Sequence, residues 1–357
     1  MKERNYGLDL LRILSMCGII GLHVINAGGV LKSYDFSCIP VEILNILAMA
    51  SVNIFAMLTG YLYINRKIKY KSIIELIMIT IFWCITISIA TRFMFPQIFI
   101  GMKMYVMSLF PPLFGRYWYL TSYVFLFFCI PYINILLNTL TSKQRKKLLI
   151  TLFIFLSVIT TFLKTDFFKV SDGYSPIWLI FCYCIGAQMY LDRQLDLNKR
   201  NLTIMLISLI LCLLGICKFG TILFYRLFDK TIILSFLITY NSPFIVIESI
   251  LVFLIFRSLK VKNNYFRKLY LNLSNSAFEV YIIHTHYLIY NYVITNNFSF
   301  LESYGLFGTV LGILLAIISI YLTCSVLSKI RKILFKIFKV SIFSEKVGEN
   351  IHKIFIG

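Results

Sequence analysis

Charged side chains are scarce in this chain of 357 residues. Asp, Glu, Lys and Arg together make up only 14% of the sequence, whereas hydrophobic residues make up 59%. A soluble globular protein carries about 25% charged residues, so this composition excludes that class. Apolar runs of about 20 residues recur along the chain and indicate several helices that cross a membrane.

Acidic residues are the scarcer of the two charged classes. The chain has 15 Asp and Glu against 35 Lys and Arg, which gives a net charge of +20. Such a charge could suggest nucleic-acid binding, but no soluble segment is present to carry a basic face. The basic residues instead lie between the apolar runs, as the positive-inside rule describes. We therefore expect membrane lipids as neighbours and no nucleic-acid partner.

Metal-ligand and disulfide patterns are also missing. The chain has only four histidines, and eight of its nine cysteines lie in or beside apolar runs without ligand spacing. The P-loop, the glycine pattern of dinucleotide-binding folds and the HExxH and GxSxG motifs are absent. The sequence therefore predicts no metal site, no disulfide framework and no active site of a common soluble type.

Ten apolar segments predict an all-α fold, a polytopic membrane bundle of about ten transmembrane helices. If the N-terminus is cytoplasmic, 25 Lys and Arg lie in cytoplasmic segments and 9 in outer segments, with Arg12 inside a span. This bias predicts that both termini are cytoplasmic. The expected spans are 8–30, 41–63, 72–92, 117–136, 148–163, 176–190, 201–217, 243–256, 270–290 and 305–326.

The chain divides into one large domain and a short tail. We assign residues 1–336 to a single integral-membrane domain, because no soluble segment interrupts the spans. Residues 337–357 alternate apolar residues with lysines, which is typical of a helix that lies at a membrane surface. We expect this tail to be cytoplasmic.

The first span contains three ionisable residues, Asp9, Arg12 and His23. Such groups cost about 2.5–3.5 kcal/mol each at a span centre, so they usually face a protein interior or an aqueous cavity. Asp9 and Arg12 are neighbours on one helix face. Arg12 and His23 share a face within about 20° and lie about 16 Å apart along the helix axis. The spacing predicts one polar stripe that runs past the bilayer centre.

Each residue of this stripe has a structural and a functional interpretation. His23 could simply bond to a neighbouring helix, or it could act as a general base, because imidazole exchanges a proton near neutral pH. Arg12 could extend to the interface, or it could bind an anion, because guanidinium suits phosphate and carboxylate. Asp9 would orient Arg12 or neutralise it.

Two later segments hold further candidates. His284 and His286 lie in the span 270–290 and point in different directions, and we take His284 as the one that contributes to a site. The second segment opens the fourth span at the outer surface. Its aromatic residues would form either an interfacial belt or a platform for a carbohydrate, because aromatic rings stack on sugar faces. The candidates in this segment are Arg116, Trp118 and Tyr119.

Four segments, in this order, resemble signatures of the acyltransferase 3 family, whose integral-membrane members modify bacterial surface carbohydrates. The first-span signature, an arginine followed after ten residues by a histidine with an acid before the arginine, is matched by GLDLLRILSMCGIIGLH. The second-span segment is matched by NIFAMLTGYLY, in which Thr59 replaces a serine. The third element is matched by GRYWYL. The late span that ends in Tyr-x-x-His is matched by SAFEVYIIH, with Glu279 where a small residue is common.

This resemblance implies a membrane-bound O-acyltransferase, most simply an O-acetyltransferase, in the bacterial plasma membrane. The donor would be cytoplasmic acyl-CoA, and acetyl-CoA in particular, as a co-substrate without any permanently bound cofactor. The acceptor would be a hydroxyl of a cell-surface polysaccharide or of its lipid-linked precursor. The alternative is a membrane transporter or a translocator of lipid-linked glycans, because intramembrane charges also suit that class.

The resemblance also implies roles for the candidate residues. The catalytic set would be His23, Arg12 and Asp9, with His23 acting as a general base or as a transient acyl carrier. Coenzyme A would be held by basic residues that include Arg12, Arg66 and Lys67. The acceptor would contact Arg116, Trp118, Tyr119 and His284.

Overall fold

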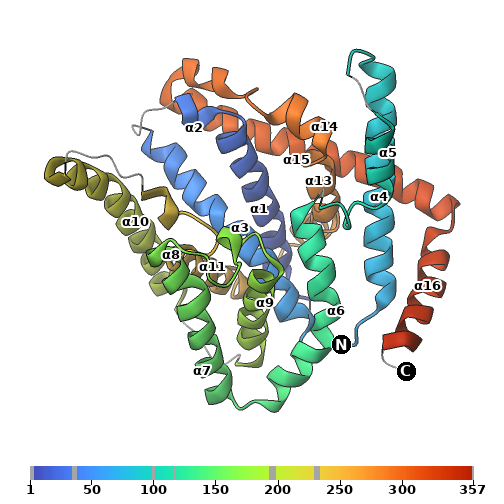
Figure 1. Cartoon of the computed structure of the whole chain (residues 1–357), viewed down its shortest axis with the longest axis horizontal. Coiled ribbons are helices and arrows are strands. Elements are labelled where there is room, and N and C mark those ends of the chain that lie inside the picture. Colours follow the sequence, from blue (N-terminus) through green and yellow to red (C-terminus); the bar gives the residue numbers. More distant parts are fainter. Residues whose placement is uncertain are drawn as a thin grey trace.

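The computed structural model describes residues 4–33, 38–98, 101–115, 117–192, 198–228 and 234–355. Within these ranges the chain is helical and contains no β-strand (Figure 1), which confirms the predicted all-α class. The α-helices are α1 (Tyr6–Leu22), α2 (Val30–Ser33), α3 (Ile39–Tyr63), α4 (Tyr70–Met94), α5 (Met102–Leu109), α6 (Trp118–Thr139), α7 (Ser142–Phe153), α8 (Thr160–Leu163), α9 (Pro176–Leu191), α10 (Lys199–Phe228), α11 (Pro243–Arg257), α12 (Asn264–Ser274), α13 (Ala277–His284), α14 (Tyr287–Ile289), α15 (Gly305–Ile337) and α16 (Val340–Phe355). The π-helices are η1 (His23–Ala27), η2 (Ile154–Ile159) and η5 (Tyr290–Ile294), and the 3-10 turns are η3 (Ser171–Gly173), η4 (Leu234–Leu237) and η6 (Ser299–Tyr304).

The membrane-spanning character of the chain is carried by seven helical segments among the described residues. Each of them is long and apolar enough to cross a bilayer. The expected spans at α9 and α11 are shorter helices of 16 and 15 residues. The chain is thus a multi-pass helical protein, while the count of ten and the cytoplasmic position of both termini stay predictions. The seven segments are Tyr6–Ala27, Ile39–Tyr63, Tyr70–Met94, Trp118–Thr139, Ser142–Leu163, Lys199–Leu227 and Tyr287–Ile337.

The centre of the bundle is built on α3, which packs against α1 on one side and α9 on the other. The approach of α3 and α9 depends on two glycines. A Cβ atom at Gly60 would lie 1.9 Å from the carbonyl oxygen of Tyr183, and one at Gly186 would lie 1.9 Å from that of Met57. Helices in membranes associate through such small residues. Gly60 therefore serves the packing of α3 on α9.

Replacing Gly60 with Ala is expected to destabilise the bundle by about 1–3 kcal/mol, the usual cost of overpacking a filled core. The backbone of α9 has to move to admit the methyl group. The matched control is Gly215→Ala in α10, where no atom lies within 4 Å of the added carbon. Thermal unfolding in detergent should show a lower midpoint only for Gly60→Ala. Equal midpoints for the two variants would contradict the close packing of α3 on α9.

The ninth expected span, 270–290, is not one continuous helix. It breaks between α12 and α13, where the Ser276 hydroxyl lies 2.9 Å from the Ser325 hydroxyl and the Tyr321 hydroxyl donates to the Leu273 carbonyl at 3.0 Å. Serine side chains compete with helical hydrogen bonds by bonding to nearby backbone carbonyls, and here the Ser276 hydroxyl also donates to the Leu273 carbonyl at 2.8 Å. The polar sequence LNLSNS interrupts the span there, and a second break at Thr285 and His286 separates α13 from α14, so three short helices lie where one was expected.

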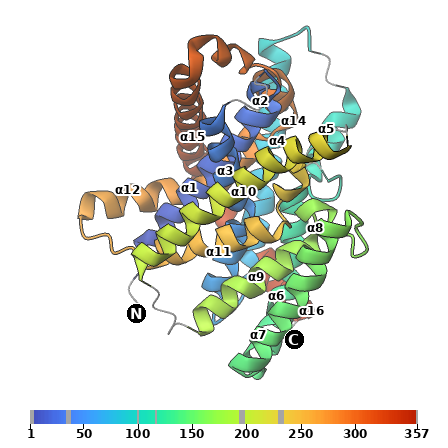
Figure 2. The ribbon, with the colours of Figure 1, turned by 90° about the vertical axis from the view of Figure 1, so that its left-hand side faces the viewer.

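The C-terminal part of the chain folds back onto α4. Lys71 at the start of α4 pairs with Glu345 of α16 at 3.1 Å, and the Tyr70 and His352 rings lie 6.0 Å apart. The tail is therefore helical, as predicted, and its location at a membrane surface stays a prediction. Figures 1 and 2 place the first and last parts of the chain at the same end of the bundle.

One basic residue that the charge count assigns to the cytoplasm is in fact buried. Arg331 of α15 is only 7% exposed, and its guanidinium pairs with both carboxylate oxygens of Glu279 on α13. The same carboxylate accepts hydrogen bonds from the Ser328 hydroxyl at 2.7 Å and the Trp83 indole N–H at 3.1 Å. Glu279 thus joins α13 to both α15 and α4.

Candidate functional site

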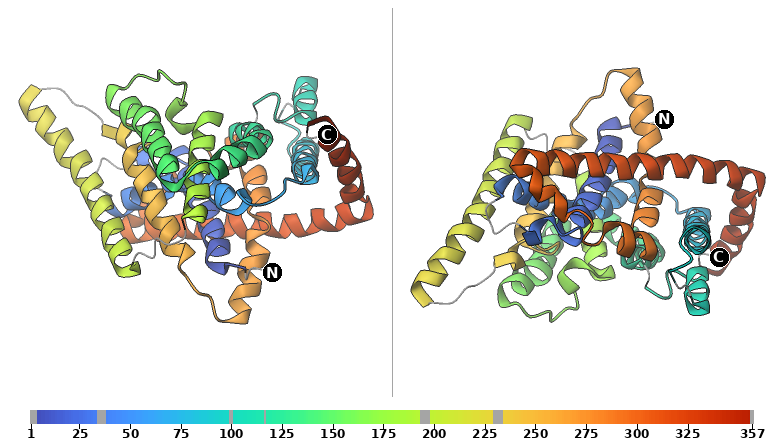
Figure 3. Two further views of the ribbon diagram at one scale, coloured as in Figure 1. Left: turned by 90° about the horizontal axis from the view of Figure 1, so that it is seen from below. Right: turned by 90° about the horizontal axis from the view of Figure 1, so that it is seen from above.

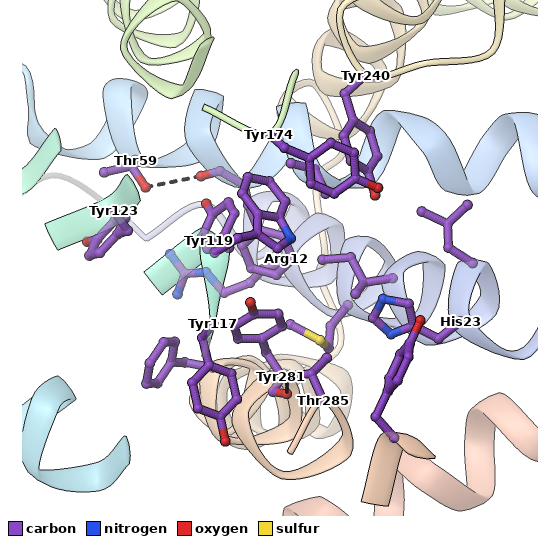
Figure 4. A pocket seen from close by; sticks show the side chains of 18 of the residues that line it. Arg12, His23, Thr59, Tyr117, Tyr119, Tyr123, Tyr174, Tyr240, Tyr281 and Thr285 are labelled. Carbon is purple, nitrogen blue, oxygen red and sulfur yellow. Dashed lines mark hydrogen bonds between the residues drawn. The ribbon is translucent and has the colours of Figure 1, made fainter. Parts of the chain in front are cut away.

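A cavity of about 750 Å³ lies inside the bundle and brings together most of the predicted site residues. Figure 4 shows Arg12 and His23 of the first helix projecting into this cavity at different positions along it. The remaining walls come from α3, α4, α6, α13, α14 and η5, from the end of α12 and from loops near α9 and α11. The lining residues used below are Arg12, His23, Thr59, Trp118, Tyr119, Tyr123, Tyr174, Tyr240, Ser274, Asn275 and Tyr290.

His23 forms a pair with His284 across two helices. Nδ1 of His23 lies 3.1 Å from Nε2 of His284, and Nδ1 of His284 lies 2.5 Å from the backbone carbonyl of Val280. A carbonyl only accepts, so Nδ1 of His284 donates to it and Nε2 of a neutral His284 carries a lone pair. Nδ1 of His23 then donates to that lone pair. This leaves the lone pair of a neutral His23 on Nε2, the nitrogen free for a substrate.

The backbone changes at His23 as well. The α1 helix ends at Leu22, and a π-helical turn runs from His23 to Ala27, closed by a 2.7 Å hydrogen bond from the Gly28 N–H to the His23 carbonyl. The carbonyl of Ala27 accepts from the Asn296 N–H at 2.8 Å. Single π-turns within helices frequently mark functional sites. The loop that follows η5 thus fixes the turn that carries His23.

Arg12 lines the cavity without a partner. It forms no hydrogen bond or ion pair with any residue in the part of the chain that the structure describes. Figure 4 shows its guanidinium beside Tyr119 and Tyr123 of α6. An unpaired cation within a membrane bundle is costly unless a counter-ion or water reaches it. The arrangement favours an anionic ligand at this end of the cavity.

Asp9 does not orient Arg12, contrary to our expectation. Its carboxylate accepts two hydrogen bonds from the Arg4 guanidinium, at 2.7 and 2.8 Å, and a third from the Ser274 hydroxyl at 3.2 Å. Arg4 precedes the helix and its long side chain folds back along the first turn, where a bidentate pair is favourable. Ser274, unlike Asp9, lines the cavity. Asp9 therefore acts on the cavity wall through Ser274.

The remaining predicted residues are divided between the cavity and the surface. Trp118 and Tyr119 at the start of α6 line the cavity, whereas Arg116 lies outside the described residues. Arg66 and Lys67 are exposed in the turn after α3 and do not reach the cavity. The structure thus brings the two aromatic candidates into the cavity with Arg12 and His23 and leaves the two basic candidates outside it.

Several aromatic residues of the cavity were missed by the sequence analysis, among them Tyr174 and Tyr240. The rings of Trp118 and Tyr174 lie 4.7 Å apart, and those of Tyr174 and Tyr240 lie 5.0 Å apart. Each tyrosine comes shortly before a Ser-Pro pair that begins a helix, α9 or α11. Proline favours the first turn of a helix, so each Ser-Pro pair marks a helix start in the sequence. The position of a tyrosine just before such a helix start was the signal that could have identified both residues.

Asn53 holds part of this aromatic group in place. It is fully buried, its amide donates to the Tyr240 carbonyl at 2.8 Å, and its side-chain oxygen accepts from the Trp178 indole N–H at 2.8 Å. Asn53 opens the segment NIFAMLTGYLY in α3. That segment therefore both packs against α9 and positions an aromatic wall of the cavity.

The chemical character of the cavity follows from its lining. Arg12 is its permanently charged side chain, and no Asp, Glu or Lys is among the described residues that line it. Nine tyrosines and one tryptophan supply apolar ring faces together with hydroxyl or indole N–H groups. Such a cavity suits an anion at Arg12, and near His23 it suits a neutral group that carries hydroxyls rather than an ammonium ion.

Comparison with known protein families agrees with this arrangement. The profile of the family described as "acyltransferase domain" matches residues 5–329, a range that includes both ends of the cavity and all four resembling segments. Comparison with curated proteins and with solved structures gives no match. Because the match covers nearly the whole chain and the expected motifs surround one cavity, the chain belongs to the acyltransferase 3 family and is a membrane acyltransferase.

Proposed function

We propose that the protein transfers an acetyl group from cytoplasmic acetyl-CoA to a hydroxyl of a cell-surface polysaccharide or its lipid-linked precursor, in the bacterial plasma membrane. The observation that carries this proposal is the cavity in which an unpartnered Arg12 and an oriented His23 lie along one helix. An anionic donor and a neutral hydroxyl acceptor are the two ligands that these groups would recognise.

The length of the donor supports this placement. Arg12 and His23 are separated by about 16 Å along the helix axis. The pantetheine arm of coenzyme A has roughly 13 bonds between its phosphorus and its sulfur, and an extended peptide-like chain of that size reaches about 15 Å. With a phosphate on Arg12, the thioester would lie near His23. The cavity would then hold the arm between its tyrosines.

The chemistry at His23 follows from its tautomer. Nε2 would take the proton of the acceptor hydroxyl while that oxygen attacks the thioester carbonyl. The tetrahedral intermediate would collapse with loss of the thiolate of coenzyme A, which would take the proton back from His23. In the alternative route, Nε2 itself attacks the carbonyl and expels the thiolate of coenzyme A. In a second step the acceptor hydroxyl attacks the acetylated His23 and takes the acetyl group, while its proton passes to the thiolate. Both routes need His284 to hold the Nδ1 proton.

The acceptor would enter beside the aromatic wall. Trp118, Tyr174 and Tyr240 offer ring faces that can cover the apolar face of a sugar, and their polar tips can bond to its hydroxyls. The absence of acidic residues among the described lining residues disfavours an ammonium group at this place. The acceptor atom would therefore be oxygen rather than nitrogen.

Binding of acetyl-CoA to the purified protein tests the donor site. Acetyl-CoA is expected to raise the thermal unfolding midpoint of the wild-type protein. In Arg12→Gln its affinity should be about 10- to 100-fold weaker, because a hydrogen bond to a charged group is lost. The matched control is Arg226→Gln, which removes an exposed arginine of α10 outside the cavity. A similar loss in both variants, or no stabilisation of the wild type, would contradict the donor site.

The O-acetyl content of the surface glycan, measured by NMR with and without the gene, tests the reaction itself. If the protein is an acetyltransferase, cells without the gene should still export the glycan, but the glycan should lack its acetyl groups. A transporter or translocator predicts loss of the exported glycan with normal acetylation of what remains. The two outcomes are exclusive, so this experiment decides between the two classes.

A further inference from the structure

A second cleft, of about 280 Å³, lies outside the main cavity. It is enclosed by α4, the last turns of α15 and the first turn of α16. Figure 3 shows α15 running across the bundle and turning into α16 beside α4. Its polar wall consists of Glu75, Lys332, Lys336 and Ser341. None of the proposed donor or acceptor contacts uses these residues.

Three of the four ionisable groups of the cleft have no partners in the described chain. Glu75 is partly buried, Lys332 and Lys336 are exposed, and none of the three forms an ion pair or hydrogen bond with a described residue. Arg331 also borders the cleft, but its charge is matched by Glu279. Two lysines against one glutamate leave the cleft with a net charge of +1. It therefore lacks one negative charge and one hydrogen-bond donor for Glu75.

The floor of the cleft is apolar. Ile79 and Phe335 line it, and the Phe335 ring packs edge-on against Phe82 with centroids 5.6 Å apart. On α4 the exposed Ile89 and Phe93 follow Glu75 by 14 and 18 residues, so they share its helix face within about 40°. A ligand that fills the cleft therefore meets charged groups at one end and apolar surface along α4. This combination suits an amphiphile rather than a free phosphate.

We propose that this cleft binds the headgroup of a phospholipid with one phosphodiester and an uncharged hydroxyl-bearing group, the chemistry of phosphatidylglycerol. The single negative charge of the phosphate balances the net charge of the cleft and pairs with Lys332 and Lys336. A headgroup hydroxyl donates to the Glu75 carboxylate, and the Ser341 hydroxyl donates to the phosphate. The acyl chains follow the apolar face of α4 from Ile79 towards Ile89. The lipid thereby joins α4, α15 and α16.

Native mass spectrometry of the full-length protein, titrated in detergent with phosphatidylglycerol, tests this assignment. The wild-type protein is expected to retain one lipid. In Lys332→Gln/Lys336→Gln its affinity should fall by about 30-fold, since each basic residue near a lipid surface contributes about a factor of five. Both lysines are exposed, so their replacement leaves the packing intact. The matched control is Lys143→Gln/Lys147→Gln on α7, which removes two exposed lysines without described partners.

Three outcomes would overturn the proposal. Equal retention by the two double variants would show that bound phosphatidylglycerol does not use the cleft. Displacement of the lipid by inorganic phosphate at millimolar concentration would assign the cleft to a soluble phosphate. Equal affinity for phosphatidylethanolamine would show that the charge balance does not select the headgroup. Retention that is lost only in the Lys332/Lys336 variant and resists inorganic phosphate supports the lipid site.

Discussion

Replacement of His23 by Gln is expected to lower the rate of acetyl transfer by about 10²- to 10⁴-fold, the usual contribution of a general base. Glutamine fits the space and can still bond to His284, but it cannot accept a proton from a hydroxyl. The loss holds for both routes, because an amide also cannot carry the acetyl group. The measurement is the O-acetyl content of the surface glycan by NMR, normalised to the amount of protein in the membrane.

His352→Gln provides the matched control, because His352 lies on α16, outside the cavity, and its ring faces Tyr70. The surface glycan of a His352→Gln strain should be acetylated as much as that of the wild type. A His23→Gln strain with normal acetylation would show that the base is another residue. Binding of acetyl-CoA should survive in His23→Gln, since Arg12 remains in place. Loss of acetyl-CoA binding together with loss of acetylation would indicate a damaged fold rather than a missing base.

His284→Gln should give a smaller defect, because His284 bonds to His23 but does not line the cavity, so we now expect it to position His23 rather than to contact the acceptor. A misplaced general base costs about 10²-fold. The pH dependence separates the two roles. In His284→Gln the remaining rate should still rise as His23 loses its proton, whereas in His23→Gln that rise should disappear. An identical flat profile in both variants would contradict the assignment of His284 as a positioning residue.

The arrangement of Arg12 and His23 could be predicted from the sequence because a regular helix connects them. From Tyr6 to Leu22 the backbone keeps the 3.6-residue period, so a separation of eleven residues determines both the shared face and the distance along the axis. The all-α class followed in the same way from composition. Predictions of this kind depend only on local geometry, which the sequence encodes directly.

The partners of the charged residues could not be predicted, because they depend on contacts between distant segments. Asp9 is paired with Arg4 through a side chain that folds back from outside the helix. Glu279 is paired with Arg331, 52 residues later, across two helices. A charge count assigned Arg331 to the cytoplasm because it follows a span, although tertiary packing buries it. The aromatic wall was missed for the same reason, since Tyr174 and Tyr240 lie in separate loops.

The second large effect that we expect concerns the buried ion pair of Glu279 and Arg331. Replacing Arg331 with Met should destabilise the protein by about 3–5 kcal/mol, because the Glu279 carboxylate is left without its counter-charge in the interior. Trp83 and Ser328 still donate to that carboxylate, but two neutral donors do not replace a guanidinium. The thermal unfolding midpoint in detergent should fall well below that of Lys329→Met, which removes an exposed lysine on the same helix.

A second change should reverse this loss. In Arg331→Met/Glu279→Gln no charge remains, and the amide oxygen of the introduced glutamine can still accept from Trp83 and Ser328. Pairs of buried charges can be replaced by neutral groups at little cost, whereas breaking one partner is costly. The double variant should therefore be more stable than Arg331→Met alone. An additive result, with the double variant least stable, would show that the pair contributes a net attraction larger than its cost of burial.

The same pair links stability to the active site. Glu279 lies on α13, the short helix that ends at His284, and it holds this helix against α15 and α4. A helix of eight residues that follows a break in the span has little stability of its own, so its position depends on such contacts. Arg331→Met should therefore also lower acetyl transfer, by displacing His284 from His23, and Arg331→Met/Glu279→Gln should restore both properties together. Restored stability without restored transfer would mean that the charge itself, rather than the position of α13, matters for the reaction.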